Sequence, residues 1–397
     1  MINIGQIHMT EYELESRAAK AVVAEAPGRI HLLGDQGDPK TGLFLSAAID
    51  RYIQVAVDMR KDNSFRFYAA DLGERKRSTL MNLKYRREDR WANYLKTAIF
   101  VFIELGFPMK GINFSFCGDI PQQVGLASST AIETAAAAAL RNLLHVQISD
   151  VYLAEKLREA HETLFGDEVA LADYLVCLLA RKDQFLVIDA AAGEVKRIKS
   201  PLSRFRLLLV DSRVPRFGAE NEIAARKDDT LKGLELLSQK FDGAGFRDIA
   251  SADLLESLGD FPEQLRRRSM HIVEEIHRIR DGEDALERSD LASLAKIIFH
   301  SHESLRDLYE ISCPEIDWLV KRAQELEGVA GSRITGHGFG GCTYTIIRRE
   351  LVEEYKNRLE EYERIFGFRP VIYEVKLATG ARVITKSRGV YADTAHK

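Results

Sequence analysis

The segment PQQVGLASST at residues 121–130 has the composition of a phosphate-binding loop. It contains Pro121 and Gly125, and its two serines, Ser128 and Ser129, directly precede an alanine-rich run of high helix propensity. A helix N-terminus presents unpaired backbone N–H groups and the positive end of the helix dipole, so a glycine-containing loop leading into it can hold an anion. The segment lacks the GxxxxGK[ST] spacing of the common P-loop, and taken alone a serine pair before an alanine run is more often a plain helix cap.

Two charged residues stand alone among apolar neighbours. Asp173 lies in LADYLVCLLA, an apolar stretch with helical spacing, and Arg29 lies in APGRIHLLG. A buried carboxylate is costly unless it is paired, so Asp173 is either a partnered structural residue or a functional one. Arg29 is a reasonable partner, because its positive charge would keep the pKa of the carboxyl low and the group ionised at neutral pH.

A second glycine cluster, GSRITGHGFGGCT, matches GxGxxG at Gly336, Gly338 and Gly341. The dinucleotide-binding fingerprint needs a strand before it and a helix after it, whereas the following CTYTII is typical of a strand. The cluster therefore predicts a strand, a glycine turn and a second strand. Its glycines either only permit positive φ in a tight hairpin or also let the backbone approach a ligand closely.

The elements that must position these residues follow from hydrophobic periodicity. The first half reads as strands alternating with helices, and the second half as mainly helical with strands around the glycine cluster. The predicted helices cover residues 93–105, 149–163, 262–280, 290–302, 316–326 and 350–365, with a short one around residue 173; the predicted strands include 43–49, 52–58, 184–190, 205–211, 342–347 and 371–376.

A chain of 397 residues exceeds what one hydrophobic core usually serves, so we expect two lobes around a ligand-binding cleft. A basic, proline-containing link at residues 196–203 places the boundary, giving lobes 1–203 and 204–397 in an α+β fold.

The charge pattern and the apolar runs restrict the class of partner. Basic and acidic residues, 56 and 60 in number, are mixed throughout, so a broad positive surface for nucleic acid is not expected. No uncharged apolar run reaches the roughly 18 to 20 residues of a membrane span, and the N-terminus lacks the pattern of a signal peptide, so we expect a cytoplasmic protein. The four cysteines are widely separated, which favours free thiols over a zinc site or disulfides.

Taken together, these segments resemble the galactokinases, within the family of kinases that act on galactose, homoserine, mevalonate and phosphomevalonate (GHMP kinases). The likeness covers nearly the whole chain in the same order; it lies in APGRIHLLGDQGDPKTG, WANYLKTAI, PQQVGLASSTAIE, SHESLRDLYEISCPEIDWLV and GSRITGHGFGGCT. The resemblance implies a two-lobed GHMP-kinase-like fold with the active site in the cleft. It further implies Mg²⁺-dependent transfer of the γ-phosphoryl group of ATP to a sugar hydroxyl, which would convert galactose to galactose 1-phosphate in a monomer or weak homodimer.

The resemblance also assigns roles to residues. Asp173 falls on the catalytic aspartate of galactokinases and Arg29 on the arginine that supports it. Trp91, and with it Tyr94, falls on aromatic positions near the adenine, and Glu162 matches a magnesium ligand if one residue is deleted before Asp173. The implied ATP-binding residues of the loop are Pro121, Gly125, Leu126, Ala127, Ser128 and Ser129, of which Ser129 also lies near the metal.

The departures from the family fall mainly in the sugar pocket. Where galactokinases read GEHTDYN this chain reads GDQGDPK, so Asp35 replaces a longer acid and Gln36 a histidine, while Asp38 is retained. The tyrosine that closes the family's sugar site corresponds to Ile223. These four residues are the implied substrate contacts, and the altered set leaves room for another sugar, an amino sugar, a uronic acid or a polyol.

The loop itself also differs from the family, since it carries Gln122 and Gln123 where a small residue and glycine are usual, so altered nucleotide binding is possible. A catalytically silent sensor of sugar and ATP is a further alternative, against which the retention of Arg29 and Asp173 argues. A purely structural module with no nucleotide is the third.

Overall fold

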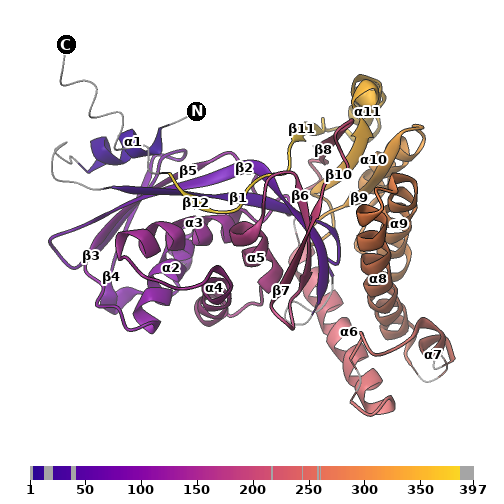
Figure 1. The fold of residues 1–397 in the computed structure, drawn as a ribbon, viewed down its shortest axis with the longest axis horizontal. Coiled ribbons are helices and arrows are strands. Elements are labelled where there is room, and N and C mark those ends of the chain that lie inside the picture. Colours follow the sequence, from indigo (N-terminus) through magenta and orange to yellow (C-terminus); the bar gives the residue numbers. More distant parts are fainter. Residues whose placement is uncertain are drawn as a thin grey trace.

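Two β-sheets, each with its own helices, organise the chain (Figure 1). The structure is a computed structural model that describes residues 3–12, 21–36, 42–215, 218–243, 245–256, 259 and 261–384. None of the helices in these ranges is long and apolar enough to cross a membrane.

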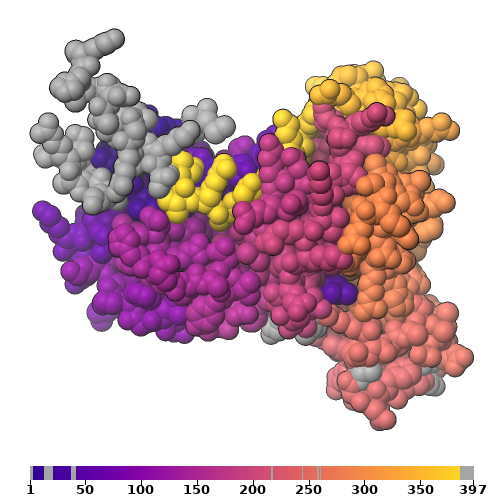
Figure 2. All heavy atoms as spheres, viewed as in Figure 1, coloured from indigo at the N-terminus to yellow at the C-terminus, as the bar shows by residue number. Residues whose placement is uncertain are grey.

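The first sheet has eight strands in the order β12-β1-β2-β5-β3-β4, with β6 on β2 and β7 on β6. All neighbouring pairs are antiparallel except β3 with β5. The strands are β1 (Val22–Leu33), β2 (Leu43–Met59), β3 (Ser64–Ala69), β4 (Glu74–Thr79), β5 (Ile112–Gly118), β6 (Gln184–Asp189), β7 (Glu194–Lys199) and β12 (Arg382–Val383). The last of these comes from the C-terminal end of the chain, which Figure 2 shows in yellow lying over the surface of the first lobe.

Four helices cover one face of this sheet, and a short N-terminal helix lies on the other (Figure 1). The alanine-rich helix packs directly on β1 and β2, because its small side chains, fully buried at Ala135, Ala136 and Ala137, allow the close approach of a helix to a sheet. The helices are α2 (Ala92–Glu104), α3 (Ser128–Leu143), α4 (Asp150–Phe165) and α5 (Leu171–Leu179) on the first face and α1 (Ile4–Glu11) on the second.

The second sheet is antiparallel, in the order β11-β8-β10-β9, and α9, α10 and α11 pack against it. α8 packs on α9 and also contacts α6, α7 and the first sheet. Its strands are β8 (Phe205–Asp211), β9 (Val329–Ile334), β10 (Cys342–Arg348) and β11 (Val371–Val375). The helices are α6 (Ala219–Lys240), α7 (Ser251–Glu256), α8 (Glu263–Glu287), α9 (Leu291–Ser304), α10 (Pro314–Gln324) and α11 (Val352–Phe366).

The predicted α+β class is confirmed, and so are the predicted helices and strands to within a few residues, except that α8 runs on to Glu287. The apolar run 43–49 and the alternating run 52–58 form one strand, β2. The link predicted at 196–203 is wrong in its first half, because residues 196–199 belong to β7, which pairs with β6. The proposed lobe boundary at 203/204 therefore lies between β7 and β8, while β12 returns to the first sheet.

Candidate active site

A cavity of about 310 Å³ lies where the two lobes meet. Its wall is built by the end of β1, the loop that leads into α3, the start of α5, one side of α6 and the glycine turn between β9 and β10. Several of the residues singled out in the sequence line this one cavity. They are Arg29, Asp35, Gln36, Tyr94, Gln123, Gly125, Leu126, Ala127, Ser128, Ser129, Asp173 and Gly336.

Asp173 and Arg29 form a buried, bidentate ion pair. Arg29 donates from Nε to Asp173 Oδ1 at 2.7 Å and from Nη2 to Oδ2 at 2.8 Å. The third guanidinium nitrogen, Nη1, donates to the carbonyl of Gly125 at 2.7 Å, so the same side chain ties the carboxylate to the loop before α3. Both side chains are at least nine-tenths buried.

His31 is a partner that the sequence reasoning missed. Its Nε2 lies 2.8 Å from Asp173 Oδ1, and its Nδ1 lies 2.7 Å from Ser46 Oγ on β2. A signal for it exists in the sequence, because residues two apart on a strand point to the same face, and His31 follows Arg29 at that spacing. Polar residues at Arg29 and His31, within an otherwise apolar strand, therefore indicate one shared partner.

These contacts determine the protonation state of Asp173. Burial by itself would raise the pKa of this carboxyl, but the charge of Arg29 and the hydrogen bond from His31 outweigh burial, and the pKa lies far below its ordinary value. Asp173 is therefore a firmly ionised carboxylate. It is a weak base with a fixed orientation, suited to align a hydroxyl group rather than to ionise it in advance.

The loop before α3 ends in a helix N-terminus without a side-chain cap. Ala127, at the N-cap position, has φ 59° and ψ 41°, and the serines of the pair are the first two residues of the helix rather than its cap. Gln123 and Gly125 also have positive φ, at 61° and 87°. This unusual backbone leaves the first N–H groups of α3 to a ligand in the cavity, which favours the phosphate interpretation over the plain cap.

The glycine cluster forms the turn that joins β9 and β10, as the sequence predicts, and no helix follows it. Gly336 and Gly338 have φ of 85° and 87°. A Cβ on Gly336 would lie 2.7 Å from the Cα of Gly125, so both residues must be glycine for the two loops to touch. The close approach that the glycines allow is thus between two parts of the same chain.

The predicted substrate turn lies at the end of β1. Asp35 accepts a hydrogen bond on Oδ2 from the backbone N–H of Gly336 at 2.8 Å, and Gln36 Nε2 donates to the Gly336 carbonyl at 2.8 Å. Asp38 lies outside the described residues. Ile223 is a partly buried residue of α6 and is not among the described residues that line the cavity; Lys227 and Thr230, further along the same helix, are.

Of the two aromatic residues matched to positions near the adenine, Tyr94 lies in the cavity wall. Trp91 packs in the core against Phe116, and its Nε1 donates to Glu74 at 2.8 Å. Tyr94 stacks on Phe165, with ring centroids 5.1 Å apart, and Phe165 stacks on His161 at 4.4 Å. In the described part of the chain, Trp91 does not line the cavity, because its ring points from the start of α2 toward the sheet.

Glu162 also lies outside the cavity wall as described. It forms an ion pair with Arg158 at 2.8 Å on the outer side of α4, whereas the preceding residue, His161, faces the cavity. Adjacent helical residues point about 100° apart. The one-residue deletion assumed in the match therefore selected Glu162, whereas the side chain that faces the cavity is that of the residue before it. His161 contacts Glu133 at 2.8 Å and Asp167 at 3.2 Å.

The described residues contain no cluster of three or more His, Cys, Asp or Glu side chains that could hold a metal ion. Ser129 does line the cavity, beside the uncapped helix end. Mg²⁺ keeps several waters and is bound through one or two protein ligands together with substrate phosphates, so this donor set suits an ion that enters with a nucleotide. It does not suit a metal caged by protein side chains.

Comparisons with known proteins place the chain in a family. The model described as the galactokinase galactose-binding signature matches residues 10–59, that of the GHMP kinases N terminal domain residues 93–181, and that of the GHMP kinases C terminal residues 283–364. A protein of Treponema pallidum (strain Nichols) is 38% identical over 97% of this chain and 97% of its own length. The chain belongs to the galactokinase branch of the GHMP kinases.

Other members of the GHMP kinases agree with this placement. The Galactokinase of Roseiflexus sp. (strain RS-1) is 32% identical over 92% of this chain and 94% of its own length. The crystal structure of Lactococcus lactis galactokinase complexed with galactose matches with a TM-score of 0.89 at 23% identity, covering 94% of this chain and 97% of that chain. The Methanococcus jannaschii mevalonate kinase matches at 0.63. The predicted GHMP-kinase fold is thereby confirmed.

Proposed function

We propose that this GHMP kinase is a galactokinase: it transfers the γ-phosphoryl group of ATP to the anomeric hydroxyl of galactose. One observation carries the proposal. The ionised Asp173 and the uncapped N-terminus of α3 line the same cavity, so a hydroxyl group on the carboxylate and a phosphate on the helix end can meet there. The relatives named galactokinase and the galactose-binding signature at residues 10–59 support galactose as the hydroxyl compound.

In the proposed reaction the residues around Asp173 align the acceptor. The hydroxyl group donates its hydrogen bond to Asp173, its oxygen forms a bond to the γ-phosphorus, and the bond from that phosphorus to the β,γ-bridging oxygen breaks, leaving ADP. The hydroxyl proton passes to Asp173 and then to water. Because the pKa of Asp173 is strongly lowered, the proton moves late, as a loose phosphoryl-transfer transition state allows.

The helix end and the loop hold the other partner. The first N–H groups of α3 bind phosphate oxygens, and the hydroxyls of Ser128 and Ser129 are placed beside them in the cavity wall. Bound Mg²⁺ neutralises phosphate charge in such reactions, and Ser129 is the residue that would contact it. Tyr94, stacked on Phe165, offers an aromatic face for the adenine.

The sugar side of the cavity carries acceptors for hydroxyl groups. Asp35, whose Oδ1 has no hydrogen-bond partner among the described residues, and the amide of Gln36 line it together with Asp173. Such a site discriminates strongly between sugars, because an unmatched buried polar group costs about 1 to 3 kcal/mol. We further propose that the enzyme is cytoplasmic and works as a monomer or weak homodimer.

A sugar panel tests the proposal. ATP consumption by the purified protein with Mg²⁺ is measured against galactose, other hexoses, amino sugars, uronic acids and polyols, and the product is identified by phosphorus and proton NMR. We expect the highest kcat/KM with galactose and phosphate on its anomeric oxygen. Turnover only with another compound would overturn the galactose assignment, and binding of sugar and ATP without turnover would identify a silent sensor.

A further inference from the structure

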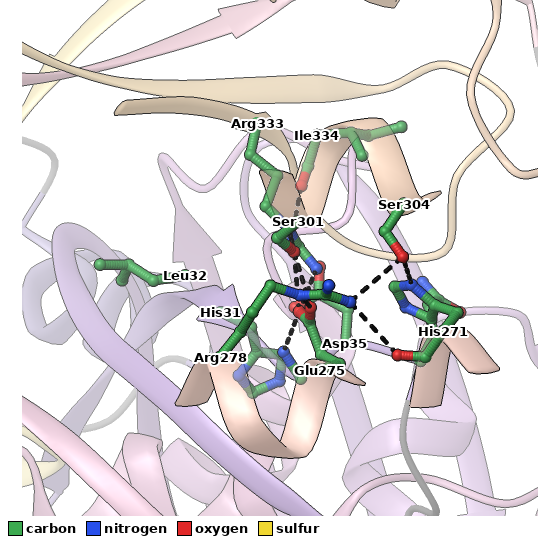
Figure 3. Close-up of polar contacts among 12 residues, drawn as sticks. His31, Leu32, Asp35, His271, Glu275, Arg278, Ser301, Ser304, Arg333 and Ile334 are labelled. Atoms are coloured by element: carbon green, nitrogen blue, oxygen red, sulfur yellow. Dashed lines mark hydrogen bonds and ion pairs between the residues drawn. The ribbon is translucent and has the colours of Figure 1, made fainter. Parts of the chain in front are cut away.

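The substrate turn of the first lobe is fastened to the second lobe by a buried network of charges (Figure 3). Its centre is Arg333 on β9, which is 0% exposed. The guanidinium of Arg333 donates from Nη1 to Asp35 Oδ2 at 3.2 Å and from Nη2 to Glu275 Oε1 at 3.1 Å. It also donates from Nε to Ser301 Oγ at 2.8 Å, so its orientation is fixed from three sides.

Glu275, on α8, holds the residue that directly precedes Asp35. Its Oε1 accepts the backbone N–H of Gly34 at 3.1 Å, and its Oε2 accepts Arg278 Nε at 2.7 Å. Burial would raise the pKa of Glu275, but the charges of Arg278 and Arg333 lower it well below its usual value. Two carboxylates and two guanidinium groups thus balance each other between β1, α8 and β9 (Figure 3).

The two oxygens of Asp35 differ in their surroundings. Oδ2 is held by Arg333 and by the N–H of Gly336, whereas Oδ1 is buried and, in the part of the chain that the structure describes, has no hydrogen-bond partner. The side chain is only 2% exposed and lines the cavity. A buried carboxylate oxygen is costly without a donor, so Oδ1 is prepared to accept a hydrogen bond from a ligand.

We propose that Arg333 and Glu275 are positioning residues for substrate recognition: they hold the Asp35 carboxylate so that its Oδ1 accepts a hydroxyl of the sugar. The inference rests on the proposed function, since it requires a hydroxylated substrate in this cavity. Its physical reason is that a buried ion network of this kind gains little stability over apolar packing. What it does provide is a fixed position and direction for the Asp35 carboxylate.

A double-mutant cycle tests this role. Arg333→Met removes every guanidinium contact at similar length, and we expect it to raise the KM for galactose roughly 10- to 100-fold. The KM for ATP should stay within about twofold, because none of the hydrogen bonds of Arg333 to described residues goes to the nucleotide loop. Asp35→Ala should raise the galactose KM at least as much, and the double variant should equal Asp35→Ala within about twofold, since Arg333 acts through Asp35.

Arg268→Met is the matched control. Arg268 is an equally buried arginine of α8 that donates to the carbonyl of Leu308 and to Glu310, away from the substrate turn. It should lower the melting temperature without changing the galactose KM. Effects of Arg333→Met and Asp35→Ala that simply add, or a rise in both KM values together, would show a merely structural role for Arg333 and overturn the proposal.

A second variant covers the case in which Arg333→Met does not fold. Glu275→Gln keeps the shape of the side chain and its contact with Gly34 but removes the charge that orients Arg333, and should raise the galactose KM roughly 3- to 10-fold. An unchanged galactose KM in this variant would overturn the proposal. If the wild type phosphorylates another sugar instead, the galactose assignment alone fails, and the same cycle is measured with that sugar.

Discussion

Two buried aspartates line the cavity, each held by an arginine, and they differ in which oxygen atoms are left for a ligand. Asp173 is bound on both oxygens by Arg29 and His31. Asp35 is bound by Arg333 on one oxygen only, and its other oxygen is free among the described residues. A carboxylate held on both oxygens is fixed in charge and direction, as the reacting centre needs, and the second lone pair of Oδ2, which accepts from Arg29 Nη2, can still receive the hydroxyl. A carboxylate held on one oxygen leaves the other to recognise a hydroxyl.

The two clusters also differ in how they are assembled. Arg29, His31 and Asp173 lie on β1 and α5 of the first lobe. Asp35 is held by β9 and the glycine turn of the second lobe, and Glu275 of α8 accepts the N–H of the preceding residue, Gly34. The comparison therefore predicts different kinetic effects. Damage to the Asp173 cluster should lower kcat, and damage to the Asp35 cluster should raise the KM for the sugar.

The largest expected effect is that of Asp173→Asn. The amide keeps the size of the side chain but loses the charge that aligns the hydroxyl and receives its proton, so kcat should fall roughly 1000-fold. The measurement is ATP consumption with galactose, alongside a melting curve that verifies folding. Full activity in a folded Asp173→Asn protein would remove Asp173 from the chemistry.

Replacing the arginine of each cluster by lysine tests whether the two clusters affect kcat and KM differently. Arg29→Lys and Arg333→Lys each keep a positive charge but replace a planar fork with a point charge. For Arg29→Lys we expect kcat to fall roughly 10- to 100-fold with little change in the galactose KM, because a bidentate pair to the reacting carboxylate is lost. For Arg333→Lys we expect the KM to rise while kcat changes little.

Steady-state kinetics of both lysine variants, measured at saturating ATP, separate these outcomes. The distinction between the two clusters would be wrong if both variants lowered kcat alone or raised KM alone.

The ionisation of His161, which lines the cavity, predicts how the stability of the protein depends on pH. Burial lowers the pKa of His161, but hydrogen bonds with Asp167 and Glu133 raise it to about 10. A raised pKa means that the stabilising contribution of the charged ring is fully present below its ordinary pKa of 6.5 and is lost as the pH rises through about 10. His161→Asn should therefore melt several degrees lower than the wild type at neutral pH, and the difference should shrink toward pH 10. Melting curves across this range would refute the charged state if the difference stayed constant.

The smallest expected effect is that of Glu162→Gln. Glu162 pairs with Arg158 and is separated from the described cavity wall, so kcat and the ATP KM should change by no more than about twofold. The Mg²⁺ dependence of the rate is measured in parallel. A loss of activity that high Mg²⁺ restores would instead support Glu162 as a metal ligand.

Much of this arrangement could be predicted from the sequence, because the signals are local. The hydrophobic periodicity gave most helices and strands, and isolated charges in apolar segments identified Arg29 and Asp173 as a possible pair. The strand-like residues after the glycine cluster correctly excluded a dinucleotide fold. Each of these signals is visible in residue types within about a dozen positions, although the pairing of Arg29 with Asp173 itself spans 144 positions.

The remaining features depend on side-chain directions or on distant pairs. Asp35 and Arg333 are 298 residues apart, and neither segment contains a sequence pattern that identifies the other as its partner. His161 and Glu162 are neighbours on one helix, and one position decides which face a side chain occupies. A match that requires a one-residue deletion does not determine which of the two faces the cavity. Trp91 could point to the core or to the nucleotide, and only the packing against Phe116 decides. The roles assigned to these residues remain proposals.

A crystal structure with galactose and a non-hydrolysable ATP analogue would show directly whether the acceptor and the phosphates meet in this cavity. We expect the anomeric oxygen within about 3 Å of a carboxylate oxygen of Asp173, and another hydroxyl at the same distance from Asp35 Oδ1. The phosphates should lie on the N-terminus of α3. A sugar bound beyond hydrogen-bonding reach of Asp173, or phosphates away from that helix end, would contradict the proposed reaction.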